Sequence, residues 1–344
     1  MHESQQTRQK AKSEGDQKPN MYFFHKNNLS FAKPVLLLPF CLLTLSYFFF
    51  FSDNSGFQPL FTDSSCTTTK NSALDLFPLQ DTNLRIFIGI LTVPRLHELR
   101  HLLRLVYSSQ TRSLGTAKVD VRFVFCHSMN EEQKIFLKLE IKQYNDIIIL
   151  DCFENLNDGK TYTYLSSLPS MLRGAGDDQP YDYVVKADDD AYFRLDNLAK
   201  LLRDKPRQDL YYGMELGCKG AQIACGVNNT FMAGFGYVLS WDLVEWIAES
   251  EIARNNKVGA EDVMVGKWLN TANKGKNRYN GFPNQLYDYK GDSPDGYFWR
   301  ELVPDTVAVH KLKENSHWAR TLDYFNATHG LRHSKPLQAM GFID

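Results

Sequence analysis

The chain has 344 residues and a formal net charge of −1. It is long enough for one large domain or two ordinary ones, and its bulk charge gives no reason to expect binding to nucleic acid. Neither a Walker-type phosphate loop nor an internal repeat is present in the sequence, which argues against P-loop enzymes and repeat folds.

The first 83 residues are predicted to form a tail, a membrane span and a stem. Residues 1–33 are polar and rich in Lys, Arg, Gln and Asn, a composition typical of disorder. Residues 34–51 are uncharged and apolar, and as a helix this run spans roughly 26 Å, enough for a thin early-secretory bilayer. Bases precede the run and mostly acids follow it, so the positive-inside rule places the tail in the cytosol. Residues 52–83, rich in Ser, Thr, Asp and Pro, are predicted to form a luminal stem.

Two other interpretations of the apolar run are weaker. A cleaved signal peptide is disfavoured because the polar lead is far longer than a usual n-region and no small-residue cleavage site follows cleanly. A buried core helix is disfavoured by the run of Phe and by the flanking charges. We therefore expect a single signal-anchor helix, with residues 84–344 forming a luminal domain.

The cysteines and glycosylation signals agree with a luminal domain. Four cysteines lie beyond the stem: Cys126, Cys152, Cys218 and Cys225. An even number of thiols in an oxidising lumen indicates disulfides, although spacing does not determine their connectivity. We prefer a Cys218–Cys225 pair, which would close a short loop. Asn228 and Asn326 begin glycosylation tripeptides, which also occur often by chance.

From residue 84 onward, apolar strands alternate with helices of regular apolar spacing. The strands are predicted at 84–92, 119–126, 146–151 and 183–187, and the helices between them at 95–110, 130–144 and 161–172. Because these strands are almost continuously apolar, we expect an α/β domain with a mostly parallel sheet and helices on both faces. Next come a helix at 195–202, strands at 210–214 and 233–240, helices at 241–250 and 259–269, and then mainly loops around a strand at 306–313.

The strand at 183–187 runs directly into three carboxylates, Asp188, Asp189 and Asp190. Such carboxylates repel one another unless a cation lies among them, and acidic oxygen ligands favour Mg²⁺, Mn²⁺ or Ca²⁺. In open α/β sheets, ligands bind beyond the carboxyl ends of the strands. The motif therefore predicts a metal-assisted site for a phosphate-bearing ligand, with a solvated acidic turn as the alternative.

Three later features are candidates for the same site, and each has a structural alternative. Gly234 and Gly236 flank an aromatic residue, and they permit either close approach of a ligand or a bend into the next helix. Glu261 and Asp262 open a helix, where the helix dipole alone favours acids. His310 ends a short strand, and a lone histidine there is more often structural than a ligand.

Together these segments resemble glycosyltransferase family 31, the luminal β-1,3-linking galactosyl- and N-acetylglucosaminyltransferases of the Golgi. The resemblance covers about residues 84–315, and six motifs match in order: Arg100–Tyr107, Asp151–Thr161, Val185–Asp190, Gly234–Ser240, Glu261–Gly266 and His310. Two segments depart from the family pattern. The family's usual Thr-Trp after the second arginine is Val106-Tyr107 here, and its Tyr-Pro-x-Tyr before the glycine segment is replaced by residues 228–232. Both differences fall near parts that shape the donor or acceptor pocket, so the identity of the transferred sugar stays open.

The resemblance implies an inverting hexosyltransferase with a GT-A (Rossmann-like) fold, acting on a UDP-sugar donor and a glycan or glycoprotein acceptor. The sugar would be galactose or N-acetylglucosamine, and the cofactor Mn²⁺ or Mg²⁺. The metal would be held by Asp190 and His310, while Asp188 and Asp189 would contact the nucleotide sugar, its ribose or the metal's waters. The resemblance also implies a single-pass type II protein of the Golgi membrane, and a homo-oligomer is compatible with it.

Inversion in one displacement needs a base on the face opposite the leaving group. The resemblance places this base at Asp262, with Glu261 as the fallback. Four basic residues are candidate donor contacts: Lys160 and Lys186 for the diphosphate, and Arg100 and Arg104 for the nucleotide pocket. Ion pairs within the protein explain these four equally well. A different class also stays open, a Ca²⁺-dependent carbohydrate-binding or scaffolding membrane protein with this fold and no turnover.

Overall fold

The computed structural model describes residues 84–111, 114–127, 129–173, 179–218 and 230–327. All of them belong to one compact unit, Phe77–Asp344. The predicted tail, membrane span and stem lie outside the described residues, and so does Asn228. In the described ranges, no helix combines the length and the hydropathy needed to cross a bilayer.

A seven-stranded sheet with the strand order β3-β2-β1-β4-β7-β6-β8 forms the centre of this unit. Its strands are β1 (Arg85–Leu91), β2 (Lys118–Cys126), β3 (Ile147–Leu150), β4 (Tyr183–Asp188), β6 (Leu210–Gly217), β7 (Thr230–Ser240) and β8 (Asn277–Asn280). The first four strands of this order pair in parallel, as do β6 and β8, whereas β7 is antiparallel to both of its neighbours. The predicted α/β class is confirmed, and the sheet is mixed because β7 runs opposite to the other strands.

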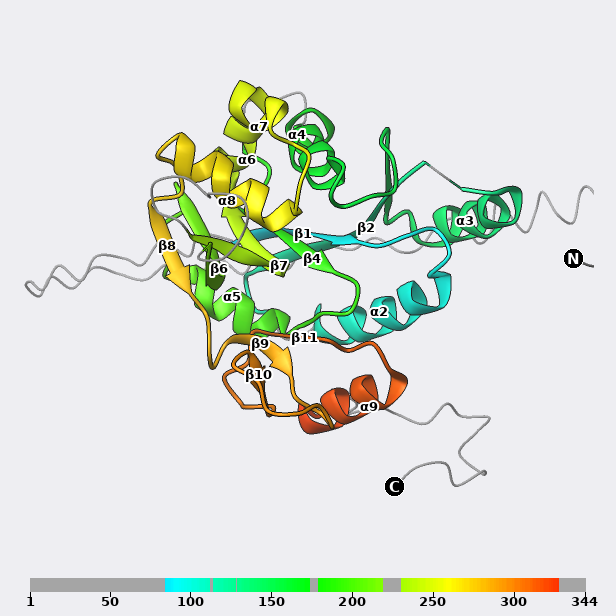
Figure 1. Cartoon of the computed structure of the whole chain (residues 1–344). Coiled ribbons are helices and arrows are strands. Elements are labelled where there is room, and N and C mark those ends of the chain that lie inside the picture. Colours follow the sequence, from blue (N-terminus) through cyan, green and yellow to red (C-terminus); the bar gives the residue numbers. More distant parts are fainter. Residues whose placement is uncertain (1–83, 112–113, 128, 174–178, 219–229, 328–344) are drawn as a thin grey trace, which may run out of the picture. The chain divides into compact units, whose positions relative to one another are not determined.

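Helices cover both faces of this sheet (Figure 1). On one face lie α2 (His97–Gln110) and α5 (Leu195–Arg203), and on the other lie α4 (Lys160–Leu172), α6 (Trp241–Glu249) and α8 (Glu261–Thr271). Alternate residues of a strand point to opposite faces. Accordingly, Ile88 of β1 packs in the core that contains α2 and α5, while its neighbour Phe87 packs in the core that contains α4 and α6. Burial on both faces explains why the sheet strands are continuously apolar.

The region after α8 was predicted to consist mainly of loops around a strand at 306–313. Loops do make up much of it and that strand is present, but several short strands and a helix were missed. A second sheet with the order β10-β9-β11-β5 is built from β5 (Tyr192–Phe193), β9 (Leu286–Tyr289), β10 (Trp299–Arg300) and β11 (Ala308–His310). Strands of two to four residues are too short to show a periodicity, and β5 pairs with β11 across more than a hundred residues of sequence. The helices α7 (Glu251–Asn255) and α9 (Asn315–Tyr324) were not predicted either.

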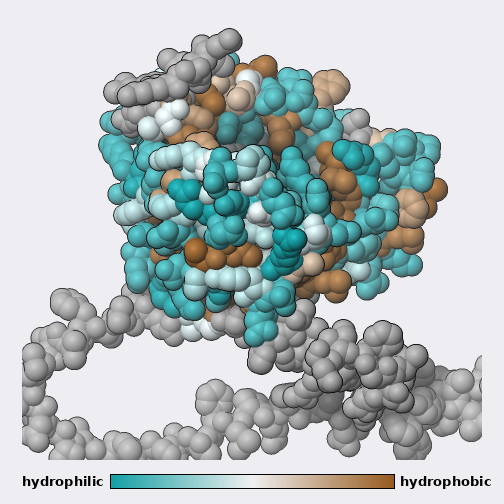
Figure 2. All heavy atoms as spheres, turned by 60° about the horizontal axis from the view of Figure 1, so that its bottom comes forward, coloured by the Kyte–Doolittle hydropathy of each residue, from teal (hydrophilic) through white to brown (hydrophobic). Residues whose placement is uncertain are grey.

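The side of the unit that carries β9, β10 and α9 is shown in Figure 2. It is mainly hydrophilic, and its hydrophobic residues lie in separate patches. Single exposed apolar residues are normal on a water-facing surface. The appearance of this face is therefore that of a water-facing surface.

A disulfide between Cys126 and Cys152 joins the end of β2 to the segment after β3. The sequence spacing did not predict this pair, but β2 and β3 are parallel neighbours, so their carboxyl ends lie together. Cys218 is disulfide-bonded as well, and its predicted partner Cys225 lies outside the described residues. Asn326 follows α9 (Asn315–Tyr324) in a left-handed backbone conformation, with a φ of 52°.

Candidate active site

The centre of the large sheet contains a topological switch point. From β1 the chain continues to β2 and β3 on one side, whereas β4 lies on the other side of β1. Ligands of open α/β sheets bind in the crevice at the carboxyl ends of the strands at such a point. Here the crevice is a cleft of about 1170 Å³, lined by Leu91 and Thr92 at the end of β1 and by the three aspartates at the end of β4. The Asp188–Asp190 motif therefore lies where the strand pattern predicts a ligand site.

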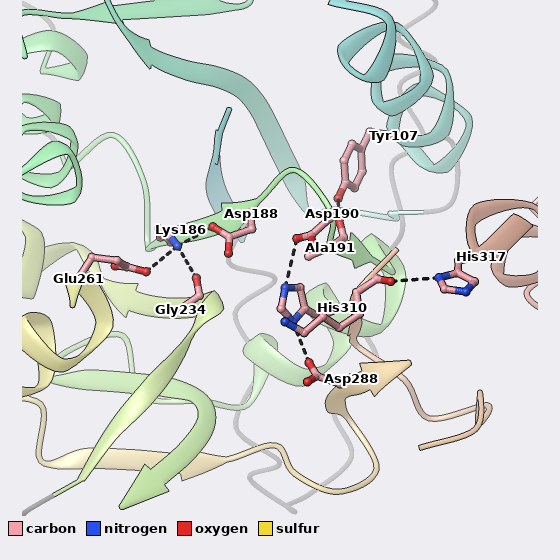
Figure 3. A network of polar contacts seen from close by, with 11 residues as sticks. Tyr107, Lys186, Asp188, Asp190, Ala191, Gly234, Glu261, Asp288, His310 and His317 are labelled. Atoms are coloured by element: carbon pink, nitrogen blue, oxygen red, sulfur yellow. Dashed lines mark hydrogen bonds and ion pairs between the residues drawn. The ribbon is translucent and has the colours of Figure 1, made fainter. Parts of the chain in front are cut away.

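Asp188, Asp190 and His310 come together in this region (Figure 3). One ligand atom from each residue lies within 4.8 Å of the others, and His310 Nε2 is 3.1 Å from Asp190 Oδ1. The second, four-stranded sheet (the small sheet) brings these residues together. Its strand β11 ends at His310 and pairs with β5, which follows Asp190 closely along the chain. Two carboxylates and an imidazole form a donor set that fits a divalent cation.

The charges in this group are strongly coupled. Burial alone would raise the pKa of Asp190, but the hydrogen bond and positive charge of His310 outweigh it, and the pKa is lowered. Burial alone would lower the pKa of His310, but Asp190 and Asp288 outweigh it, and the pKa is raised. The pKa of Asp189 is raised by burial and by its two aspartate neighbours. This local excess of carboxylates is an environment that a bound cation would stabilise.

Lys186 of β4 is buried and lies next to Asp188 of the Asp188–Asp190–His310 group. Its Nζ atom is 2.7 Å from Asp188 Oδ1 and 2.7 Å from Glu261 Oε1, and it also donates to the Gly234 carbonyl. Burial alone would lower the pKa of Lys186, but the two carboxylates outweigh it and raise the pKa. Lys186 therefore links β4, β7 and α8 through contacts inside the protein, as the ion-pair alternative proposed, and it is not among the residues lining the cleft.

Glu261 and Asp262, in the first turn of α8, have different surroundings. Glu261 is buried, and burial raises its pKa to about 7. Asp262 is only partly buried. Its Oδ2 atom accepts a hydrogen bond from Gly234 N at 3.0 Å, and its Oδ1 atom accepts one from Val263 N at 2.8 Å. The Asp262 carboxylate is thus held in a defined orientation and stays the more accessible of the two acids.

The two glycines of β7 make room for side chains of the protein itself. A Cβ atom at Gly234 would lie 2.5 Å from Glu261 Oε1, and one at Gly236 would lie 2.4 Å from the Cζ atom of Phe193. Both glycines lie inside β7, so the alternative of a bend into the next helix is also not what the structure has. Glycine is needed at both positions because other groups approach the backbone closely, but those groups are side chains of the protein itself.

Lys160 lies in the wall of the cleft, at the start of α4. Its ammonium donates to the Thr92 carbonyl at 2.6 Å and forms an ion pair with Glu154. Glu154 also accepts a hydrogen bond from Cys126 N at 2.7 Å. Glu154 was not singled out from the sequence, and its only signal there is its position within the Asp151–Thr161 motif.

Arg100 and Arg104 of α2 form ion pairs with α3 (Glu131–Tyr144) and the segment after it. Arg100 contacts Glu140 at 2.6 Å, and Arg104 contacts Glu140 at 2.9 Å and Asp146 at 2.8 Å. Arg100 also donates to the carbonyls of Val93 and Pro94, in the turn that follows β1. Neither arginine lines the cleft. These contacts support the ion-pair alternative, and Arg100 supports the cleft indirectly through the turn after β1.

Comparison with known proteins identifies the family. The model of the galactosyltransferase family matches residues 98–275, just over half of the chain. The chain belongs to this galactosyltransferase family. As a family member it is a glycosyltransferase, which argues against the alternative of a binding protein without turnover.

Two curated relatives of this galactosyltransferase are beta-1,3-galactosyltransferases. The chain is 25% identical to Pvg3 of Schizosaccharomyces pombe over 307 residues, which cover 73% of this chain and 79% of that protein. It is 30% identical to beta-1,3-galactosyltransferase 6 of Mus musculus over 206 residues, which cover 54% of this chain and 60% of that protein. Among solved structures, the galactosyltransferase LgtC in complex with donor and acceptor sugar analogues aligns with a TM-score of 0.42 and 13% identity, over 74% of this chain and 99% of that one.

Two residues of the galactosyltransferase site were missed from the sequence. Asp288 of β9 lies 2.7 Å from His310 through its Oδ1 atom, and the Phe235 ring stacks on the His310 ring with centroids 4.7 Å apart. Phe235 had a signal, because it stands between the two glycines of β7. Asp288 had none, because it lies in the region predicted as loops.

Proposed function

We propose that this glycosyltransferase transfers galactose from UDP-galactose to a hydroxyl group of a glycan or glycoprotein, in β-1,3 linkage and with inversion, on a GT-A fold with a divalent cation. The observation that supports this most is that Asp188 and Asp190, which line the cleft at the switch point of a galactosyltransferase-family chain, come together with His310 in one possible cation site. Both relatives described above are beta-1,3-galactosyltransferases, which supports the choice of sugar and linkage.

Asp190, His310 and Asp188 would hold the cation, Mn²⁺ or Mg²⁺. When bound, it would stabilise the negative charge that develops on the departing diphosphate. Asp189 lines the same cleft and would contact the ribose of the donor or an ordered water. The ion pair of Lys160 with Glu154 would keep the cleft wall in place beside the donor.

Asp262 would take the proton from the acceptor hydroxyl as the sugar is transferred. Its two carboxylate oxygens already accept hydrogen bonds from backbone N–H groups, which aim the carboxylate without neutralising it. Glu261 is a weaker candidate because it is buried against Lys186.

A luminal location in the Golgi, with a type II membrane anchor at residues 34–51, is part of the proposal. The disulfide between Cys126 and Cys152 supports an oxidising compartment. The apolar run with bases before it and acids after it supports the anchor and its orientation.

The test uses the full chain, produced in a secretory host, and measures UDP release from a panel of UDP-sugars with a broad set of acceptors. We expect turnover with UDP-galactose and Mn²⁺, and its loss with EDTA or in Asp190→Ala. Asp292→Asn is the control. Asp292 is exposed and distant from Asp190 in the sequence, so this variant should keep activity. Absence of metal-dependent turnover with every donor would refute the proposed function.

A second measurement addresses the base separately. Asp262→Asn should lower kcat by about 10²- to 10⁴-fold, the usual contribution of general base catalysis, while donor binding is retained. If Asp262→Asn keeps full activity, the base assignment is wrong even though the transferase function stands.

A further inference from the structure

We propose that Asp288 is a positioning residue that sets the orientation and tautomer of the His310 imidazole, so that its Nε2 lone pair is directed at the cation beside Asp190. This inference rests on the metal-dependent function proposed above and adds a residue to its site. It makes the small sheet part of the catalytic apparatus.

The first support is the contact at Nδ1. Asp288 Oδ1 lies 2.7 Å from His310 Nδ1, while the opposite ring nitrogen, Nε2, lies 3.1 Å from Asp190. Both residues of the Asp288–His310 pair are largely buried. When the imidazole is neutral, as a metal ligand must be, a carboxylate that accepts a hydrogen bond from Nδ1–H leaves the Nε2 lone pair free for the cation, and such partners of metal-binding histidines also raise their basicity.

The second support is the register of the small sheet. β9 and β11 are parallel, and His310 is directly opposite Asp288. Side chains of directly opposite residues lie on the same face of a sheet. The pairing of the two strands therefore brings the carboxylate to the imidazole, and a slip of one residue would send the two side chains to opposite faces.

The third support is that the ring and the backbone of His310 are restrained elsewhere as well. Phe235 of β7 stacks on the ring with an interplanar angle of 10°. The next residue, Lys311, has a φ of 70°, and its carbonyl oxygen lies 3.2 Å from His317 Nδ1 of α9. Leu312 N donates to the Asp190 carbonyl at 3.0 Å. Asp288 thus acts on a histidine whose backbone and ring plane are already restrained, so its carboxylate needs only to fix which ring nitrogen faces Asp190.

The test measures the affinity of the full chain for Mn²⁺ alone, without donor, by isothermal titration or by electron paramagnetic resonance. We expect Asp288→Ala to weaken Mn²⁺ binding by about 10- to 100-fold, the usual effect of removing such a partner. Asp288→Asn keeps an oxygen that accepts from Nδ1–H, so it should lose less. Asp292→Asn is the matched control and should bind as the wild type does. In activity assays, excess Mn²⁺ should restore the kcat of Asp288→Ala.

The outcomes separate positioning from a merely structural role. Asp288→Ala that stays folded in EDTA and binds Mn²⁺ with wild-type affinity would overturn the inference. If Asp288→Ala does not fold, Asp288→Leu decides, because leucine fills the space of the aspartate but accepts no hydrogen bond, and wild-type Mn²⁺ affinity in that variant would overturn the inference. If the wild-type protein binds no Mn²⁺, both the role of Asp288 and the proposed metal requirement are wrong. If the wild-type protein binds Mn²⁺ and Asp288→Ala weakens that binding, but no UDP-sugar is turned over, the role of Asp288 stands and only the proposed function is wrong.

Discussion

The ammonium of Lys186 lies 2.7 Å from a carboxylate oxygen of Glu261, and the Lys186 side chain has no exposed surface. The same ammonium is 2.7 Å from Asp188. One buried cation is therefore shared by the proposed metal site on β4 and the first turn of α8, which carries the proposed base. Burying these charges is tolerated only because they are paired.

Lys186→Met should therefore destabilise the domain by about 3–5 kcal/mol, because it leaves two carboxylates without their shared cation. The double variant Lys186→Met/Glu261→Gln should recover part of this loss, since one of those charges is then removed. Urea unfolding in EDTA measures both. Lys134→Met, which removes an exposed lysine, is the control and should change little. Equal stabilities of the single and double variants would contradict the shared-cation interpretation.

Substitutions at three glycines should distinguish effects on catalysis from effects on core packing. Gly234→Ala places a Cβ atom against Glu261 and Asp262, so we expect kcat to fall at least tenfold. Gly236→Ala places one against Phe193 and should mainly cost stability, about 1–3 kcal/mol. Gly217→Ala is the control, because a Cβ atom there meets no atom of the described residues within 4 Å. Steady-state kinetics and thermal unfolding of the three variants check this, and a Gly234→Ala enzyme with wild-type kcat would contradict it.

Glu140 should contribute a pH-dependent part of the stability. Burial alone would raise its pKa, but Arg100 and Arg104 outweigh it, and the pKa lies below the ordinary 4.5. Its contribution is therefore complete above pH 4.5 and is lost as the pH falls through the lowered value. We expect Glu140→Gln to cost about 3 kcal/mol at pH 7 and less in acid. Urea unfolding across this pH range is the measurement.

Glu132→Gln is the matched control for that experiment, because Glu132 lies on the same helix and is exposed. It should leave the pH dependence of stability unchanged. A Glu140→Gln penalty that stays constant from pH 7 to pH 3 would show that the ion pairs are not its source.

Tyr107→Phe should loosen the segment that follows Asp190. The Tyr107 hydroxyl donates to the Ala191 carbonyl and accepts from Phe193 N, each at 3.3 Å. Its removal leaves two buried backbone groups without this partner, at a cost of about 1–3 kcal/mol. Tyr297→Phe, at an exposed tyrosine, is the control for urea unfolding. Equal stability of the Tyr107→Phe protein and the wild type would contradict this account.

The sequence predicted the first four strands of the large sheet closely because each is an apolar run bounded by polar residues. It also located Asp188–Asp190, since three acids after a buried strand are unusual. It could not assign the partners of Lys186 and Arg100, because Glu261 and Glu140 are 75 and 40 residues away along the chain. Asp288 was invisible for a related reason: strand β9 has only four residues and exists through its pairing with β11.

The bond between Cys126 and Cys152 affects how the enzyme is made in practice. It closes a loop with a sequence separation of 26 residues, for which a chain-entropy model gives about 3.5 kcal/mol of stabilisation. Glu154, two residues past Cys152, is hydrogen-bonded to Cys126 N and paired with Lys160. A chain synthesised in the cytoplasm of a bacterial host would lack the cross-link, and this corner of the cleft would depend on polar contacts alone. The choice of expression host thus becomes an experimental variable for the shape of the cleft.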